Sequence, residues 1–304
     1  MKVSVRRFSF AGQKDRNGIT RQYVSAERVL WDKLKEIDLK DIKLEFVGHS
    51  DIPIKVGSLN GNKFKIIVRE LDKPLHKIDF VVNYYDEQRF GGYRPNLHLI
   101  GKKYLLGEYE EAVKMYLLYP FSNETKDYVK ARKRQEKDWG KWHVDRYPKY
   151  SINERKIIGY LSGHPNDFKN AFKVLPKQLF SMIPQAYQSY LWNESLAEYL
   201  REKFKYWEVN YSVGKLVFVN EYMDLDWPII GNDSKLKEDE KKIIENLMKK
   251  EGVWYDTFSK GLMRKAMIKI DNFKLGSFIN GEQEVSFYLP KGAYATMVIK
   301  SLYI

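Results

Sequence analysis

The sequence of 304 residues contains no cysteine. Disulfide bonds, cysteine-ligated zinc and iron–sulfur sites, and thiol nucleophiles are therefore excluded together. Covalent catalysis by a side chain would have to use an oxygen or a nitrogen atom. The sequence also lacks any run of about 18 apolar residues, so we expect no membrane-spanning helix. Residues 1–10 lack the apolar core of a secretory signal, and we therefore predict a folded cytoplasmic protein.

Motifs for metal ions and nucleotides are missing as well. The five histidines never occur at helix-face spacing with a carboxylate between them, which is the pattern of many zinc hydrolases. Neither the GxxxxGK(S/T) loop nor the GxGxxG loop occurs. These absences disfavour a zinc hydrolase and an ATP-dependent enzyme.

Positive charge is abundant by contrast. Lysine and arginine number 53 against 40 acidic residues, which gives a net charge of +13 and a pI near 9.4. A basic protein suits a polyanionic partner, because neutralising phosphates releases counterions. A lysine-rich composition without any partner is the alternative, since thermophile proteins also raise lysine and glutamate. Charge alone leaves both interpretations open.

The apolar pattern changes twice along the chain. Alternating apolar and polar residues at 3–11 and 21–29, with Asn17-Gly18 between them, predict a β-hairpin. Further strands are predicted at residues 43–47, 64–68, 284–288 and 296–299. Helices are predicted after Leu71 and at residues 104–118, 125–138, 184–204 and 235–250, the last with Asn232, Asp233 and Ser234 as candidate caps. This order predicts an α+β fold with a helical insertion.

One predicted helix carries a basic cluster. The cluster is followed by Trp139 and Trp142 and consists of Lys126, Lys130, Arg132, Lys133, Arg134 and Lys137. Aromatic faces near cations are used to hold single-stranded or looped RNA. For the charged residues taken alone, a solvated helix face is the better interpretation.

A loop at residues 83–96 has no clear periodicity and holds several polar and planar side chains. Asn83, Tyr85, Gln88 and Arg89 occur within seven positions of it. A surface loop has no core for such side chains to fill, so this cluster favours a functional site.

The tip of the predicted hairpin places Lys14, Asp15 and Arg16 side by side. One interpretation is that Asp15 and Asn17 only shape the turn while the cations are solvated. The alternative is that the flanking cations keep the Asp15 carboxylate ionised, as a nucleophile or general base must be. Asp15 is therefore a candidate reactive group.

Five segments together resemble the TruD family of RNA pseudouridine synthases, and they occur in the family's order. They are GQKDRNGITRQ at residues 12–22, GSLNGNKF at 57–64, NYYDEQRFG at 83–91, AYQSYLWNESLAEYL at 186–200 and FYLPKGAYATMVIKSL at 287–302. Five ordered motifs are far more specific than one short pattern.

The resemblance implies a catalytic domain of the pseudouridine-synthase type, with a mixed or antiparallel sheet, interrupted by a mainly helical insertion domain. We expect the catalytic domain at residues 1–103 and 266–304 and the insertion domain at residues 104–265. The resemblance further implies an isomerase that converts uridine to pseudouridine in tRNA, at uridine 13 of the D arm, or in other structured RNA. It implies no cofactor and no metal ion, and we expect a monomer.

The resemblance also implies roles for individual residues. Asp15 becomes the catalytic nucleophile that attacks the target uridine. Tyr85 would stack on the flipped uracil, and Asn83 would position the aspartate or the base. Lys14 and Arg89 would support charge nearby. A basic surface, a carboxylate nucleophile and aromatic side chains for an extruded base all fit this assignment.

The sequence departs from the family pattern in three places. Tyr85 stands where the family usually has phenylalanine, Gly18 replaces an alanine, and Asp86 replaces a glycine and adds a carboxylate beside the candidate site. We expect Asp86 to alter the loop backbone or to repel phosphate. The family normally has a substantial segment before the aspartate motif, which here begins at Gly12. In the family that segment supplies strands to the sheet and basic residues to the RNA cleft. Without its strands we expect exposed apolar surface, and with it instability or association.

Two rival functions remain open on the sequence. A catalytically inactive RNA-binding protein of the same family would keep the basic surface but place Asp15 badly. A basic structural protein would show negligible and salt-insensitive RNA binding.

Overall fold

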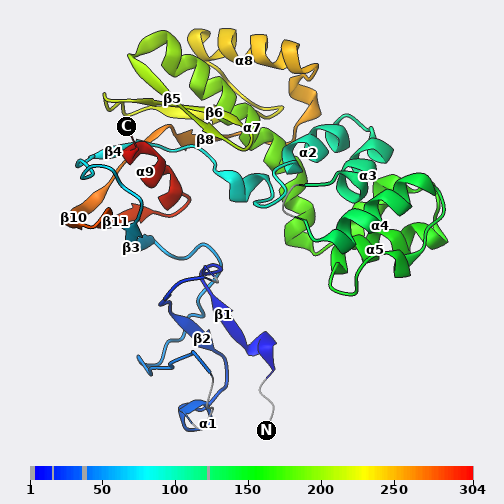
Figure 1. Cartoon of the computed structure of the whole chain (residues 1–304), viewed down its shortest axis with the longest axis horizontal. Coiled ribbons are helices and arrows are strands. Elements are labelled where there is room, and N and C mark those ends of the chain that lie inside the picture. Colours follow the sequence, from blue (N-terminus) through cyan, green and yellow to red (C-terminus); the bar gives the residue numbers. More distant parts are fainter. Residues whose placement is uncertain (1–3, 16, 36–39, 122–123, 304) are drawn as a thin grey trace.

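The computed structural model describes residues 4–15, 17–35, 40–121 and 124–303. Figure 1 shows three parts. An N-terminal segment, residues 4–60, extends away from the rest of the chain. A central body, residues 61–105 and 177–303, is built around one long helix. A helical arm, residues 109–174, projects from the body in a different direction, to the right in Figure 1.

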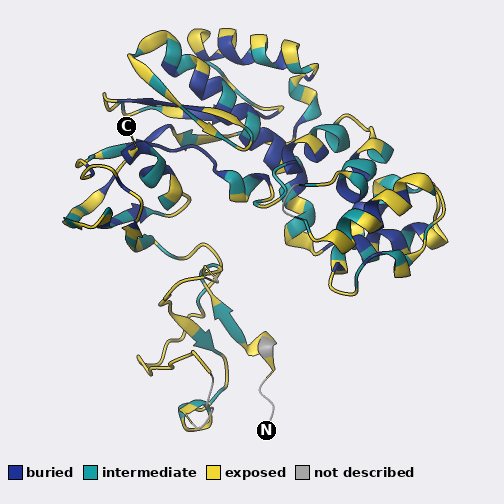
Figure 2. Cartoon of the chain, viewed as in Figure 1, coloured by how far each residue is buried: buried dark blue, intermediate teal, exposed yellow. Residues whose placement is uncertain are grey.

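The N-terminal segment contains a short hairpin, and its described residues form no core. Its elements are the 3-10 turn η1 (Val5–Arg7), the antiparallel strands β1 (Phe8–Phe10) and β2 (Val24–Ala26), and the short helix α1 (Trp31–Lys35). None of its described residues is buried (Figure 2). The predicted hairpin is confirmed, but β1 and β2 lie far apart in sequence, and the described residues between them, 11–15 and 17–23, do not form a tight reversal at Asn17-Gly18. The strand predicted at residues 43–47 is wrong, because these exposed residues pair with no described strand.

The central body begins with a three-stranded antiparallel sheet in the order β10 (Asp271–Ile279), β11 (Glu282–Pro290) and β3 (Gly61–Val68). Alternate residues of β11 are buried, including Val285, Phe287 and Leu289. A Cβ at Gly61 would lie 2.2 Å from the Leu289 carbonyl oxygen, so the close approach of β3 to β11 requires glycine there. The strands predicted at residues 64–68 and 284–288 are therefore confirmed.

Three two-stranded ribbons complete the strands of the body. They are β4 (Phe80–Val82) with β9 (Met267–Lys269), β5 (Tyr206–Tyr211) with β6 (Gly214–Val219), and β7 (Asp226–Ile229) with β8 (Leu262–Lys265). The helix predicted after Leu71 is wrong, because residues 71–79 run without a helix into β4. The strand predicted at residues 296–299 is also wrong. It belongs to α9 (Ala295–Leu302), whose buried Met297, Val298 and Leu302 recur with a helical period.

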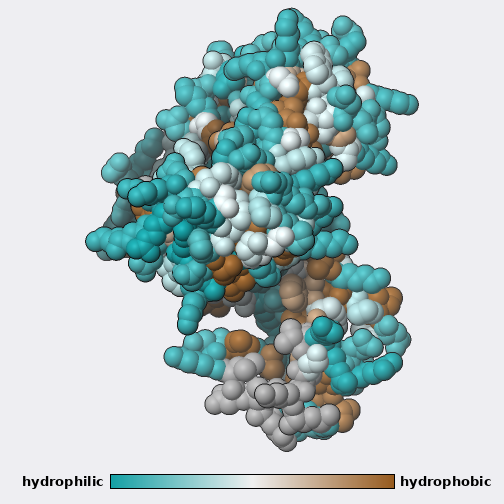
Figure 3. All heavy atoms as spheres, turned by 90° about the vertical axis from the view of Figure 1, so that its right-hand side faces the viewer, coloured by the Kyte–Doolittle hydropathy of each residue, from teal (hydrophilic) through white to brown (hydrophobic). Residues whose placement is uncertain are grey.

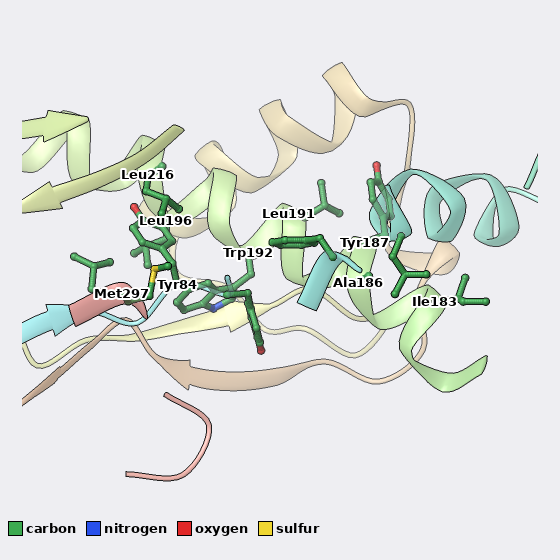
Figure 4. Close-up of a cluster of buried hydrophobic side chains, with 14 of the residues drawn as sticks. Tyr84, Ile183, Ala186, Tyr187, Leu191, Trp192, Leu196, Leu216 and Met297 are labelled. Carbon is green, nitrogen blue, oxygen red and sulfur yellow. The ribbon is translucent and has the colours of Figure 1, made fainter. Parts of the chain in front are cut away.

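Helix α7 (Lys177–Lys203) forms the axis of the body and contains the helix predicted at residues 184–204. It contacts α2 (Leu97–Leu105), α8 (Glu238–Glu251), β6 and β7. Figure 4 shows its buried side chains, among them Leu191, Trp192 and Leu196. The helix predicted at residues 235–250 is confirmed as α8, but its predicted caps are not. The Glu240 side chain accepts a hydrogen bond from the Lys237 backbone, whereas the Asp233 carboxylate binds the Gly261 N–H.

The helical arm contains α3 (Tyr109–Leu118), α4 (Lys126–Lys137), α5 (Ile152–Gly163) and α6 (Phe168–Ala171). The predicted helix at residues 104–118 is divided between α2 and α3 at Gly107, which has a φ of +79°. The helix predicted at residues 125–138 is confirmed as α4. Its Arg132 is buried and pairs with Glu124 at 2.6 Å, so one member of the basic cluster belongs to the core of the arm.

Every pairing between described strands is antiparallel, and helices α2 to α7 follow one another without an intervening strand between β4 and β5. The predicted α+β fold is therefore confirmed. None of the described helices is both long and apolar enough to cross a membrane.

Candidate active site

The loop after β4 has its backbone fixed from two sides. The Asn83 N–H donates to the Ala266 carbonyl at 2.8 Å. The Asn193 side chain, on α7, accepts from the Tyr85 N–H at 3.0 Å and donates to the Tyr85 carbonyl at 2.8 Å. One amide side chain thus binds both peptide groups of Tyr85, much as a neighbouring strand would. The direction of the Tyr85 side chain is set by these bonds.

The Tyr85 ring lies between aromatic and cationic groups. Trp192 meets it edge-on with ring centroids 5.5 Å apart, and Tyr294 does so at 6.4 Å. The guanidinium carbon of Arg264 lies 4.1 Å from the ring centroid and that of Arg89 lies 5.2 Å away. Cations at these distances are attracted to the face of an aromatic ring. The ring is therefore held firmly in one orientation.

Arg264 connects most of this cluster. Its guanidinium donates to the Asn83 carbonyl at 2.9 Å, to the Asn83 Oδ1 at 2.8 Å and to the Gly292 carbonyl at 3.0 Å. Burial lowers the pKa of Arg264 from its usual value. A partly buried guanidinium with this many acceptors is a strong positional constraint on the Asn83 loop.

Arg89 lies on the 3-10 turn η2 (Glu87–Phe90) and reaches towards α7. Its Nε donates to the Ser189 hydroxyl at 2.9 Å, and its Nη2 lies 3.4 Å from the Gln185 Oε1. The structure therefore brings together three of the predicted site residues, Asn83, Tyr85 and Arg89. Gln88, in the same loop, is exposed.

Asp86 is buried and pairs with Lys300 of α9 at 2.6 Å. Its charge is balanced inside the protein, so it is not presented to the solvent beside the site. The Lys300 ammonium also lies 3.9 Å from Glu87. Asp86 thus gives α9 a direct ionic contact with the site loop.

The hairpin tip is attached to the body beside this cluster but does not contact it. The Lys14 ammonium donates to the Asn62 side chain of β3 at 2.7 Å, and the Gly57 N–H donates to the Ala11 carbonyl at 2.7 Å. Asp15 is exposed and forms no hydrogen bond or ion pair with any described residue. The structure thus does not bring Asp15 or Lys14 into contact with Tyr85. Arg16 lies outside the described residues.

The turn between β11 and α9 links these two places. The Lys291 N–H donates to the Asn60 carbonyl at 3.0 Å, and the Lys291 ammonium donates to the Gly57 carbonyl at 3.2 Å. The next residues of the same turn supply the Gly292 carbonyl to Arg264 and the ring of Tyr294 to Tyr85. One short turn therefore contacts both the base of the hairpin tip and the aromatic cluster.

Several residues of the cluster were not identified from sequence. Trp192, Asn193 and Tyr294 lie inside segments that resemble the family, and those segments were the available signal. Arg264 lies outside all five segments, and no local pattern distinguishes it from its neighbour Lys265. Lys265 points elsewhere and pairs with Asp224 and Asp226. Within the described parts of the chain, no three histidine, aspartate or glutamate side chains are grouped to hold a metal ion.

The chain is similar to known proteins over nearly its whole length. The family model for tRNA pseudouridine synthase D (TruD) matches residues 1–224 and 215–302. A Methanococcus maripaludis protein named "Probable tRNA pseudouridine synthase D 1" is 34% identical, over 99% of this chain and 86% of that protein. The tRNA pseudouridine synthase D of Aquifex aeolicus is 30% identical, over 99% of this chain and 85% of its own.

A solved structure is similar as well. A Methanosarcina mazei crystal structure of a protein assigned to TruD superposes with a TM-score of 0.74 at 25% identity. The match covers 99% of this chain and 82% of the other. The α+β architecture with an inserted helical part is thus shared with an experimental structure. On the family match and these relatives, the chain belongs to the tRNA pseudouridine synthase D (TruD) family.

Proposed function

We propose that this protein isomerises uridine to pseudouridine in tRNA, at uridine 13, with Asp15 as the nucleophile. The observation that carries the proposal is the Tyr85 ring, held between Arg264, Arg89 and Trp192 in a chain of the TruD family. A fixed aromatic ring beside cations suits a planar base that has been turned out of an RNA helix.

The proposed reaction rearranges the uridine without adding or removing atoms. The Asp15 carboxylate attacks C1′ of the target uridine, so a bond from its oxygen to C1′ forms while the glycosidic bond from C1′ to N1 breaks. The freed uracil turns, and its C5 bonds to C1′ as the bond to the Asp15 oxygen breaks. C5 then loses a proton and N1 gains one, so the product is an isomer of the substrate. Carboxylate nucleophiles divide a difficult displacement into easier steps in this way.

The contacts of the cluster support different roles for its members. Tyr85 would stack on the uracil. Both ends of the Asn83 amide have protein partners, since its Oδ1 accepts from Arg264 and its Nδ2 donates to the Lys265 carbonyl at 2.9 Å. This favours Asn83 as a residue that positions the site. Arg89 and Lys14 would offset the charge of Asp15 and of the nearby RNA phosphates.

Asp15 has to approach the uracil for this chemistry. The hairpin tip, exposed at residues 13–15 and 17–18, is joined to the body through Lys14 and Asn62, next to the turn that carries Tyr294. We expect bound RNA to hold the tip against the Tyr85 cluster.

The test is to incubate the full chain with an unmodified tRNA transcript and to map pseudouridine by chemical derivatisation and primer extension. We expect modification at uridine 13 that disappears with Asp15→Asn and with a transcript carrying cytidine at that position. Because Asp15 is exposed and unpaired among the described residues, the variant should fold and bind tRNA like the wild type. An active Asp15→Asn variant would exclude Asp15 as the nucleophile. Tight tRNA binding by the wild type without any conversion would favour the inactive RNA-binding alternative.

A further inference from the structure

The outward side of helix α4 carries five cationic side chains, which we call the α4 cationic face. All five are exposed, and they are Lys126, Lys130, Lys133, Arg134 and Lys137. The four lysines are spaced by four, three and four residues, which places them along one side of a helix. At 1.5 Å per residue they span about 16 Å of the helix axis.

These cations have no ionic partner within the described parts of the chain. Asp127 and Glu136 lie three residues from Lys130 and Lys133, within the usual reach of a helical ion pair, yet neither pair forms. Lysines elsewhere behave differently: Lys114 contacts both Glu110 and Glu111 in the same arm. The α4 cationic face is therefore left with an excess of positive charge.

The opposite side of α4 anchors the helix to the arm. Ala131, Arg132 and Gln135 are buried there. The Arg132 guanidinium binds the Glu124 carboxylate and also donates to the Tyr116 carbonyl at 3.1 Å. The cationic face is thus supported by a fixed helix. Figure 3, which looks at the molecule from the side of the arm, shows a mainly hydrophilic surface there.

The aromatic residues that follow α4 are used in packing. Trp139 and Trp142 meet with ring centroids 4.9 Å apart, and Trp139 stacks on Phe168 at 6.0 Å. The Trp139 Nε1 donates to Glu110 at 2.8 Å. These rings hold the end of α4 against the arm, so the surface next to the lysines offers charge and not stacking platforms. Its chemistry suits phosphate groups better than bases.

We infer that the α4 cationic face binds the phosphodiester backbone of the tRNA at a place remote from the uridine being modified. This inference rests on the proposed function, because it assumes that tRNA is the ligand. The face lies on the helical arm, whereas Tyr85 and Arg264 lie in the central body (Figure 1). Such contacts supply affinity and orientation without reading the sequence.

Helix α8 provides a matched control. It also exposes four lysines, Lys241, Lys242, Lys249 and Lys250, on a helix of 14 residues against 12 in α4. Five acidic residues alternate with them along α8, whereas α4 has two. Replacing either set with glutamine removes the same net charge from the whole protein. Any general effect of net charge will therefore be equal in the two variants.

The experiment compares two fourfold lysine-to-glutamine variants, one on α4 (positions 126, 130, 133 and 137) and one on α8. The dissociation constant for full-length tRNA is measured by fluorescence anisotropy between 50 and 300 mM salt, and kcat and KM are measured for pseudouridine formation. Each phosphate contact adds about 0.9 to the slope of the logarithm of the dissociation constant against the logarithm of the salt concentration. We therefore expect this salt slope to be smaller by about 2 to 4 in the α4 variant. Its dissociation constant and KM should rise at least about tenfold near 0.1 M salt, with kcat unchanged.

The α8 variant should change the salt slope by less than about one. Equal effects of the two variants, or an unchanged slope for the α4 variant, would overturn the inference. Unfolding curves check that both variants are folded, which we expect because all eight lysines are exposed. The binding measurement does not depend on catalysis. A wild type that binds tRNA through α4 but forms no pseudouridine would overturn the proposed function and leave this inference standing.

Discussion

The N-terminal segment and the central body differ in how much of the chain they bury and in which proposed functional residues they carry. The segment carries Asp15, the proposed nucleophile, but none of its described residues is buried. The body buries two tryptophans completely, Trp192 and Trp227, and fixes Tyr85 against Trp192. The group proposed to do the chemistry therefore lies on the part with the least packing. The group proposed to hold the base lies on the part with the most packing.

The exposed apolar residues sharpen this difference. Large apolar side chains are visible on the N-terminal segment at the bottom of Figure 3. Those that are exposed are Phe10, Ile19, Tyr23, Val24, Leu30, Ile42, Leu44, Phe46, Val47, Ile52 and Val56. The exposed apolar surface expected from the sequence is thus present, while the expected association stays a prediction. Segments with few buried contacts open at low free energy, so we expect local unfolding to begin here.

The largest expected effect on stability tests this division directly. Trp192 is fully buried, and its Nε1 donates to the Trp227 carbonyl at 3.1 Å. Trp192→Ala should lower the free energy of unfolding by about 3 to 5 kcal/mol. Phe46→Ala, in the N-terminal segment, should change it by less than about 0.5 kcal/mol, because Phe46 is 46% exposed. Urea unfolding curves of both variants provide the measurement. Similar losses would mean that the segment contributes to the same cooperative core.

The next effect concerns activity inside the body. Arg264→Lys keeps the positive charge but cannot bond Asn83 and Gly292 at the same time as a guanidinium does. We expect kcat for pseudouridine formation to fall about a hundredfold, because the Asn83 loop would no longer be held in its position. The affinity for tRNA should be nearly unchanged. The control is Arg69→Lys, at an exposed arginine that pairs with Glu282 on the surface. If KM rises while kcat stays constant, Arg264 contacts the RNA and does not position the site.

The smallest expected effect is a pH dependence of stability in the body. His98 is buried between Phe90 and Tyr190, and desolvation by burial lowers its pKa from 6.5 to about 4. Between these two values the unfolded chain binds more protons than the folded one, so stability falls as the pH falls. We expect this histidine to remove about 1 to 2 kcal/mol between pH 7 and pH 5.

The measurement compares urea unfolding of the wild type and His98→Gln at the two pH values. The variant should lose that much less stability on acidification. His76→Gln, at an exposed histidine, should keep the dependence of the wild type. An identical dependence in the wild type and in His98→Gln would show that His98 is protonated without difficulty in the folded protein.

Local patterns predicted the long helices well. Helices α7 and α8 were found because apolar residues recur at helical spacing over many residues. Short apolar runs were less informative. Residues 296–299 have the composition of a strand but form part of α9, and residues 43–47 also have that composition but pair with no described strand. Four or five residues are too few to distinguish the helical period from the strand period. A strand also needs a neighbouring strand to pair with, and the local sequence does not show whether one is present.

Residue types and their order along the chain establish the chemical inventory of this protein: no thiol, an excess of positive charge, and a polar loop around Asn83 and Tyr85. Composition and short motifs are sufficient for this, because they depend on residue types and on spacing along the chain. Tertiary structure alone decided that Arg264 joins that loop, that Lys300 balances Asp86, and that Arg132 is buried while its neighbours on α4 remain free for a partner. Each of these contacts joins residues that lie on different elements, so folding creates them and no local pattern encodes them.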